Sequence, residues 1–356
     1  MGMKHLFFRI FISICTTAFL AGCGSSHAEK INVFIAAEWN LQALFDGEEN
    51  GKEYDEYRKS SLWTSEKYTA RLTAISRAIQ MMRQGSTPDL MGFVEVENSG
   101  VLEDLSAVLS KNGRFWTAFA SLPGSPLGIG FISRFPIIEA RSHSITVGDD
   151  TAPRPVLELR VEPDGKPMVF LLCHWKSKLG GEKVTEALRR ASAMVVQRRL
   201  RELRESEAGT PVIIMGDLNE NYDEFFRQSY LCALLPDDPD AASLAHNATG
   251  FLVLSKEKPP RSFCFPNDVP ALYSPWYEEL SEGSYFYKEE WETIDHLLLS
   301  ESLFDGSGWE FSGCRVLNQA PFSTSDGKPD RYVPRLGRGL SDHLPLLLEL
   351  RLASAY

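Results

Sequence analysis

Positive charge is scarce in this sequence. Its 356 residues include 37 Lys and Arg against 48 Asp and Glu, which gives a formal net charge of −11. This balance argues against a protein that holds nucleic acid through a broad basic face, so any phosphate must be met by a local cationic group. The chain also lacks a Gly-rich phosphate loop ending in Lys-Ser/Thr and a Gly-x-Ser-x-Gly nucleophile elbow. P-loop and serine-hydrolase chemistry are therefore not indicated.

The first 22 residues predict an export signal. Lys4 and Arg9 accompany an apolar run from Phe7 to Leu20 that is too short to span a bilayer comfortably. The following Leu20-Ala21-Gly22-Cys23 resembles the lipobox of bacterial lipoproteins, which implies cleavage before Cys23 and a lipid on that cysteine. We therefore expect a signal peptide at 1–22, a lipidated flexible tether at 23–30, and a location in the bacterial cell envelope on the extracytoplasmic side. An ordinary secretory signal with an incidental cysteine is the alternative.

Without this leader the chain has 334 residues (356 minus 22) and a net charge of −13 (35 minus 48), so electrostatic attachment to anionic lipid is not expected. Four cysteines remain in an exported, disulfide-permissive setting, and no CxxC or HxxxH spacing indicates zinc. Three pairings are open. Cys173 lies in a strand-like run and is expected to be a buried small hydrophobe. We expect the least strained disulfide bridge to join Cys232 and Cys264. The fourth of these cysteines is Cys314.

The remaining composition is that of a globular protein, with 43% hydrophobic and 24% charged residues. The motif order favours a single domain at 31–356. Helices are predicted from 65 towards Pro88, at 101–109 and at 182–205, the last with its arginines outward, and loops at 46–61 and 235–290. Strands are predicted at 31–37, 90–96, 115–120, 130–133, 137–145, 156–161, 168–173, 211–215, 294–299 and 344–350. This order predicts an α/β fold in which helices flank two stacked mixed sheets.

Polar side chains gather where several of these strands end. The six clusters are Trp39-Asn40-Leu41-Gln42, Glu95-Val96-Glu97-Asn98, His174-Trp175-Lys176-Ser177-Lys178, Asp217-Leu218-Asn219, Asp295-His296 and Ser341-Asp342-His343. A lone Glu after a strand is more often a solvated turn residue, and a lone His is more often structural. Six such clusters in one chain, each after an apolar run, predict a shared site.

With Gly216-Asp217-Leu218-Asn219 and Ser341-Asp342-His343-Leu344-Pro345, the chain resembles the endonuclease/exonuclease/phosphatase superfamily over about residues 31–352. The segments 40–46, 88–98, 174–181 and 283–287 also resemble its secreted bacterial nuclease branch. The resemblance implies the deoxyribonuclease I-like fold, a four-layer α-β-β-α sandwich, and metal-dependent hydrolysis of a phosphodiester. We expect the protein to act as a monomer.

Hydrolysis of a phosphodiester builds negative charge on the phosphate oxygens, and a hard divalent cation can stabilise that charge. Mg²⁺ prefers oxygen ligands, so we expect Mg²⁺, with Mn²⁺ or Ca²⁺ as alternatives. Glu95, with Asn40 and Asp342, is the predicted metal shell, and the resemblance assigns these positions in the same way. Glu97 shares a strand face with Glu95 and is expected to anchor a loop or support the metal ligands. Gln42 stands where many secreted relatives have a carboxylate, which leaves the number of metals open.

The attacking water needs a base, and His343 is the candidate because imidazole titrates near neutral pH. The resemblance pairs it with Asp295. Asp217 and Asn219 can face one phosphate together, the carboxylate orienting water or the leaving group and the amide donating to an oxygen. The alternative for these two residues is a structural Asx turn. His296 is expected to be structural.

The anion itself must be bound. The resemblance gives His174 the role of donating toward the phosphate or the leaving oxygen, and Arg154 a contact with phosphate, as a bidentate guanidinium would make. Asn40 and Asn219 are further candidates for substrate binding. Arg154 as an ordinary surface residue is the alternative. Local positive charge is also available from Lys176, Lys178, Arg189 and Arg190.

Three functions are compatible with these residues. The first is a lipid-anchored phosphodiesterase that cleaves extracytoplasmic DNA or RNA. The second keeps the chemistry but acts on a phospholipid or inositol phosphate, as sphingomyelinase-like relatives do, with Tyr273-Ser274-Pro275-Trp276-Tyr277 as a weak candidate for membrane entry. The third is a non-catalytic surface binding lipoprotein, which would be expected to lose catalytic groups.

Overall fold

The computed structural model describes residues 31–353, except 84, 111–112, 148–149, 152–153 and 267. The predicted signal peptide, Cys23 and the tether lie outside the described residues. Within them, no helix combines the length and the apolar character that a membrane crossing requires.

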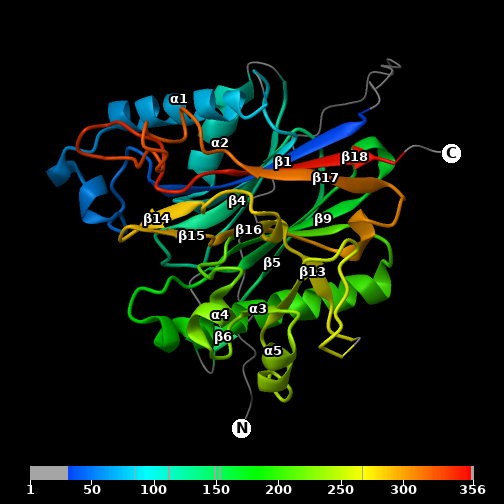
Figure 1. The fold of residues 1–356 in the computed structure, drawn as a ribbon. Coiled ribbons are helices and arrows are strands. Elements are labelled where there is room, and N and C mark those ends of the chain that lie inside the picture. Colours follow the sequence, from blue (N-terminus) through cyan, green and yellow to red (C-terminus); the bar gives the residue numbers. More distant parts are fainter. Residues whose placement is uncertain are drawn as a thin grey trace, which may run out of the picture.

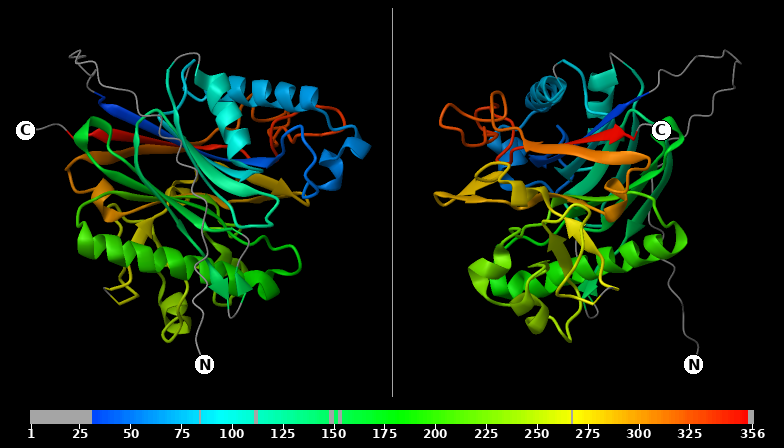
Figure 2. Two further views of the ribbon diagram at one scale, coloured as in Figure 1. Left: turned by 180° about the vertical axis from the view of Figure 1, so that it is seen from behind. Right: turned by 45° about the vertical axis from the view of Figure 1, so that its right-hand side comes forward.

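Two large sheets form the centre of the molecule (Figures 1 and 2). The six-stranded sheet has the order β17-β18-β1-β2-β4-β3, and the eight-stranded sheet has the order β11-β12-β13-β16-β10-β9-β8-β5. Strands of the first are β1 (Val33–Leu44), β2 (Leu90–Val96), β3 (Trp116–Ala120), β4 (Gly128–Ser133), β17 (Trp309–Val316) and β18 (Leu346–Leu352). Strands of the second are β5 (Ile137–His143), β8 (Val156–Val161), β9 (Met168–His174), β10 (Val212–Asp217), β11 (Leu234–Pro236), β12 (Leu252–Ser255), β13 (Ala271–Tyr273) and β16 (Asp295–Leu299). Small hairpins pair β6 (Thr146–Val147) with β7 (Asp150–Thr151), and β14 (Tyr285–Tyr287) with β15 (Glu290–Glu292).

Helices cover the outer face of each sheet, which confirms the predicted α-β-β-α sandwich. α1 (Ser65–Met81) and α2 (Ser99–Leu109) lie over the six-stranded sheet, and α3 (Glu182–Ser206) lies over the eight-stranded sheet, with the short α4 (Glu224–Gln228) and α5 (Pro239–Leu244) on the same side (Figure 1). The caps are local: the Thr64 hydroxyl accepts from the Lys67 amide, and the Asn98 side chain accepts from the Val101 amide.

The core lies between the sheets. β1 packs against β10 and β16, and central strands such as β9 and β10 are buried along their whole length because one face meets the other sheet and the other meets a helix. Gly92 of β2 leaves room for the opposite sheet, because a Cβ at this position would lie 3.0 Å from the Leu172 side chain and 3.2 Å from the Met215 side chain. The stacked sheets therefore hold their strand ends at fixed mutual positions.

Several local expectations are wrong. The first strand continues past residue 37 to Leu44, and β17 (Trp309–Val316) was not predicted. The segment 235–290, expected to be rich in loops, also contains short strands and the α5 helix, which were not predicted. On α3, Arg189 and Arg199 are buried instead of facing outward, because both guanidiniums pair with carboxylates. The four described cysteines are free, so the expected Cys232–Cys264 bridge is absent.

The Arg199 pair offers a test of stability. Arg199 of α3 donates to both carboxylate oxygens of Glu158 on β8, at 2.6 and 2.8 Å, and His143 lies 2.8 Å away. Burial opposes ionisation of Glu158, but the hydrogen bonds of His143 and Arg199 outweigh it and lower the pKa of Glu158 to about 2. The contribution of this carboxylate to stability is therefore complete above its ordinary pKa of 4.5 and is lost as the pH falls toward 2.

We expect Glu158→Gln to reduce the free energy of unfolding by about 3 kcal/mol at pH 7, because the Arg199 guanidinium loses its buried counter-charge and keeps only the half-exposed Glu202 at 3.1 Å. The difference from the wild type should shrink as the pH falls from 4.5 to 2, as denaturant titrations at several pH values would measure. Glu139→Gln is the matched control, since Glu139 and Arg141 form an exposed pair that contributes about 0–1 kcal/mol. If Glu158→Gln lost no more unfolding free energy at pH 7 than the control, the buried Glu158–Arg199 pair would not be the source of stability proposed here.

Candidate active site

The six polar clusters lie together at one edge of the sandwich. β1 and β2 run parallel, as do β9 and β10, so their carboxyl ends share an edge. Asp217 at the end of β10 pairs in register with His174 of β9 and with Asp295 of β16. The six-stranded sheet contributes Asn40 and Glu95 from the facing side.

Asn40 joins the two halves of the site. Its amide nitrogen donates to Asp217 at 3.0 Å and lies 3.3 Å from Glu95 Oε1 and 3.5 Å from His343 Nε2. Asn40, Asp217 and His343 are all nearly inaccessible to solvent. One amide therefore contacts a carboxylate from each sheet and the candidate base.

A bend in β1 places Asn40 and Glu95. Gln42 and Ala43 have left-handed φ values of 49° and 54°, and Glu95 forms a bulge with a φ of 62°. The bend turns the Ala43 amide onto Glu95, to which it donates at 2.8 Å. Arg71 from α1 donates to the carbonyl oxygens of Leu41, Gln42 and Ala43. Since left-handed backbone is unfavourable for such residues, we infer that Arg71 stabilises the bend.

His343 is bonded to a buried carboxylate. Its Nδ1 lies 2.8 Å from Asp295 Oδ2, which also accepts from the Ser284 hydroxyl at 2.6 Å. The Tyr285 ring stacks on the imidazole with centroids 4.5 Å apart and an angle of 27°. Burial disfavours the charged imidazole, but Asp295 outweighs it and holds the pKa of His343 well above its usual range.

His174 has the opposite electrostatics. Its Nε2 lies 3.6 Å from Asp217 and 3.8 Å from Glu95. Burial, together with the charges of Arg154 and His343, lowers the pKa of His174 well below its usual range. Burial also raises the pKa of Asp217 to about 7, with Asp295 and Glu95 adding to the shift and His343 opposing it. The surroundings therefore favour the protonated imidazole at His343 and the neutral imidazole at His174.

Asn219 and Arg154 meet at one carbonyl. Arg154 donates to the Trp175 oxygen at 3.0 Å, and the Asn219 side chain donates to the same atom at 3.3 Å. The Asn219 backbone amide donates to Asp217 Oδ1 at 2.9 Å, which is the contact of an Asx turn. The turn expected as an alternative is thus present, and it fixes the Asp217 carboxylate beside His174.

Glu95 and Asp342, two of the three predicted metal ligands, offer carboxylate oxygens that suit a hard cation, whereas Asn40 turns its nitrogen toward Glu95 and its Oδ1 accepts from the Gln42 amide at 2.9 Å. Glu95 and Asp342 are the most open carboxylates of the cluster, with 23% and 22% of their side-chain surface exposed. Burial raises the pKa of Asp342 and the charge of Glu95 adds to it, a repulsion that a divalent cation would relieve. Asp217, Asp295 and His343 form a second group whose ligand atoms lie within 4.8 Å of one another, a spacing that can also hold a metal ion. In that group, the hydrogen bond between His343 Nδ1 and Asp295 Oδ2 already uses one potential ligand atom of each residue.

Other predicted cations lie in structural contacts. Lys178 pairs with Glu224 at 2.8 Å, and Arg189 is buried against Glu186 and Glu220. Arg190 donates to the Thr249 carbonyl, and Lys176 contacts Ser177 and Leu179. Glu97 anchors the loop that follows β1 by accepting from the Asp46 backbone amide and the Asn50 side chain, both at 2.7 Å. His296 contacts the Glu220 carbonyl at 2.8 Å.

Four residues near the site were not predicted: Glu38, Arg71, Ser284 and Tyr285. Glu38 is fully buried without a hydrogen-bond partner, and burial, with the charges of Asp295 and Asp217, raises its pKa well above the usual range. Its position two residues before Asn40 on one strand was an available signal, because such residues share a face. Arg71 carried no signal, since an arginine in an amphipathic helix is usually solvated.

Comparisons with known proteins agree with this architecture. The sequence profile described as "Endonuclease/Exonuclease/phosphatase family" matches residues 35–352. A Bacteroides thetaiotaomicron protein of that description is 17% identical with a TM-score of 0.52, over 91% of this chain and 98% of that one. The human Nocturnin catalytic domain is 14% identical with a TM-score of 0.51, over 91% and 94%. A mannosyl-6-phosphatase of B. thetaiotaomicron is 17% identical with a TM-score of 0.50, over 89% and 99%. None of the curated proteins matches the sequence.

Proposed function

Because the chain belongs to the endonuclease/exonuclease/phosphatase family, whose members hydrolyse phosphoester bonds, we propose that it is a metal-dependent phosphodiesterase that cleaves extracytoplasmic DNA or RNA. The observation that carries the proposal is the pairing of His343 with Asp295 at 2.8 Å, beside Asn40 and Asp217. A base held by a carboxylate, next to a polar cluster at a sheet edge, is the arrangement that activation of water requires.

Each side chain has a distinct part in this reaction. Neutral His343 takes the proton of the attacking water at Nε2, while Asp295 fixes the ring and stabilises the imidazolium that forms. His174 donates through Nε2 toward a phosphate or leaving oxygen, and Asp217 and Asn219 orient these groups. Arg154 meets the phosphate charge. A divalent cation held by Glu95 and Asp342 would neutralise charge on the phosphate, and the Asn40 nitrogen holds the Asp217 carboxylate beside it.

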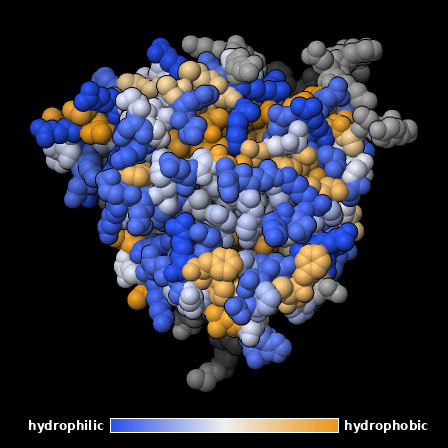
Figure 3. Space-filling model, viewed as in Figure 1, coloured by the Kyte–Doolittle hydropathy of each residue, from blue (hydrophilic) through white to orange (hydrophobic). Residues whose placement is uncertain are grey.

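Nucleic acid is favoured over phospholipid by the state of the aromatic segment. Tyr273 and Trp276 are buried, so this segment does not offer the exposed rings expected for membrane entry. Hydrophilic residues cover most of the face seen in Figure 3, where apolar residues form scattered groups. The binding-lipoprotein alternative predicts lost catalytic groups, yet His174, Asp217, Asp295 and His343 are all present. Attachment through a lipid on Cys23 is part of the proposal.

The test is a substrate panel. The purified full chain is incubated with plasmid DNA, single-stranded DNA, RNA, sphingomyelin and inositol phosphates, each with Mg²⁺ and with a chelator. We expect cleavage of at least one nucleic acid with Mg²⁺ and none after chelation. Release of phosphocholine or inositol with all nucleic acids intact would replace the proposed substrate, and inertness toward every ester would overturn the enzymatic proposal.

A further inference from the structure

A cavity opens beside the two accessible carboxylates of the candidate metal site. We call it the Tyr54 cavity. Its volume is about 890 Å³, and its lining includes the carboxylates of Glu95 and Asp342 together with Tyr54, Tyr57, Arg331 and Arg335. Cavities of about 300–1,000 Å³ are the usual size for small ligands and cofactors. A substrate portion next to the reacting phosphate can therefore enter here.

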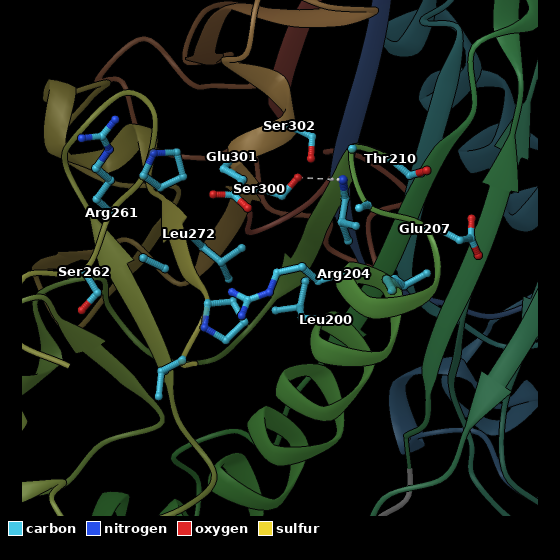
Figure 4. Close-up of a pocket in the computed structure, with 18 of the residues that line it drawn as sticks. Leu200, Arg204, Glu207, Thr210, Arg261, Ser262, Leu272, Ser300, Glu301 and Ser302 are labelled. Carbon is cyan, nitrogen blue, oxygen red and sulfur yellow. Dashed lines mark hydrogen bonds between the residues drawn. The ribbon is translucent and has the colours of Figure 1, made fainter. Parts of the chain in front are cut away.

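A second cavity shows the contrast. It has about 480 Å³ and lies at the other end of β10, where Val212 rather than Asp217 contributes to the lining (Figure 4). Leu200 and Arg204 of α3 and Leu272 of β13 form part of its wall (Figure 4). None of the candidate catalytic groups lines it, so this cavity supplies control positions.

We propose that the Tyr54 cavity is a nucleotide subsite: it binds one nucleotide unit adjoining the scissile phosphate, with the base against Tyr54 and a flanking phosphate paired with Arg335 and Arg331. This inference rests on the proposed nuclease function and adds to it the part of the substrate that the enzyme recognises.

The aromatic contact is available to a ligand. Tyr54 remains 41% exposed, although its ring already packs against Phe45 at 5.2 Å in a T-shaped contact. Tyr54 lines the same cavity as Glu95 and Asp342, so its exposed surface lies in the space beside the candidate metal ligands. Every nucleobase has a face that can stack on an aromatic ring.

The two arginines of the cavity are weakly paired, although three acids also belong to the lining. Arg335 makes no ion pair with any residue that the structure describes, and the only such contact of Arg331 is 4.0 Å from Asp342, with 72% of its side chain exposed. Glu56 is the remaining acid of the lining apart from Glu95 and Asp342. A guanidinium of this kind matches phosphate geometry, and it is the local cationic group that a chain of net charge −11 requires.

The wall that carries both arginines is held in place. The side chain of Gln42 contacts the backbone of Tyr332 twice, as a neighbouring strand would. Its Nε2 donates to the Tyr332 carbonyl oxygen at 3.0 Å, and its Oε1 accepts from the Tyr332 backbone amide at 2.8 Å. Arg71 lies 3.8 Å over the Tyr332 ring, and Val333 pairs with Arg338 across a turn. This accounts for glutamine at position 42: its amide holds the wall. A preformed wall lowers the ordering cost of binding.

The test compares two substrates in one set of proteins. The measured quantity is kcat/KM for a short single-stranded oligonucleotide divided by kcat/KM for methyl p-nitrophenyl phosphate, a diester without base or flanking phosphate. We expect Tyr54→Ala and Arg335→Ala each to lower this ratio about tenfold, the scale of one stacked base, and Tyr54→Phe to restore it. Phe263→Ala and Arg261→Ala, which remove an exposed ring and a guanidinium at the other cavity, should keep the wild-type ratio.

A binding measurement tests the nucleotide subsite separately from the proposed nuclease function. Labelled oligonucleotide is titrated into His343→Ala protein with Mg²⁺, with and without Tyr54→Ala or Arg335→Ala, and we expect Kd to rise about tenfold with either added change. If the wild type cleaves the oligonucleotide but the variants keep its ratio and its Kd, the subsite is wrong and the nuclease stands. If nothing cleaves but binding depends on Tyr54 and Arg335, the subsite stands and the nuclease is wrong. If Tyr54→Ala fails to fold, Arg335→Ala tests the subsite by itself, because replacing an exposed side chain should leave the fold intact.

Discussion

Replacing His343 by alanine is expected to reduce kcat for phosphodiester hydrolysis by about 10²–10⁴-fold, the usual contribution of a positioned general base. Nε2 of His343 lies 3.5 Å from the Asn40 amide and 4.0 Å from Asp217, so its loss removes the proton acceptor from the centre of the cluster. Steady-state kinetics with saturating Mg²⁺ on a nucleic acid substrate would measure the effect.

The matched control is His246→Ala, because His246 is exposed and lies on the short segment after α5, away from the cluster. Its kcat should stay within twofold of the wild type. The base also predicts a pH dependence. Since Asp295 holds the pKa of His343 well above its usual range, the neutral form accumulates only at higher pH, and activity should still be rising with pH above the usual range of an imidazole. A His343→Ala enzyme with wild-type kcat would exclude this residue as the base.

Arg71→Met is expected to lower the free energy of unfolding by about 3–5 kcal/mol, the largest stability change we predict. Arg71 is 2% exposed and donates to three carbonyl oxygens of the β1 bend, at 2.6, 2.8 and 3.0 Å. Hydrogen bonds to a charged group contribute about 1.5–3 kcal/mol each, and a buried carbonyl left without its donor costs about 1–3 kcal/mol. Denaturant unfolding followed by fluorescence would measure the change.

Arg77→Met on the same helix is the control, since Arg77 is exposed and its loss should change stability by less than about 0.5 kcal/mol. The Arg71 variant should also lose activity even where it remains folded, because the bend carries Asn40 and turns the Ala43 amide toward Glu95. Arg71→Lys should recover little, as an ammonium lacks the planar fork that reaches three acceptors. A loss equal to that of Arg77→Met would show that the bend holds without this residue.

The parts of the fold that the sequence predicted well are those with local signals. The strand at 90–96 agrees with β2 at both ends, because an apolar run lies between a proline turn and polar residues. The strand-end clusters were recognisable for the same reason: a buried run followed by Asp, Asn or His needs no knowledge of the partner strand. Their convergence then follows from parallel pairing, as for Asp217 beside His174.

The parts that were missed depend on distant residues. Nothing near Gln42 and Ala43 announces left-handed backbone, since the donor that supports it, Arg71, comes from a helix 28–30 positions further on. Arg189 was expected in solvent although Glu186 lies one turn before it, because its second carboxylate partner, Glu220, follows a different strand. β17 was missed because Gly313 interrupts its pattern where the pairing register shifts.

The stacking of the two sheets has a kinetic consequence. Asn40 and Glu95 come from one sheet, whereas His174, Asp217 and Asp295 come from the other, so neither half contains a working set of groups. A chain that has formed its secondary structure but has not yet docked its layers is inert. Recovery of enzymatic activity during refolding would therefore time the final assembly step, independently of how quickly helices and strands appear.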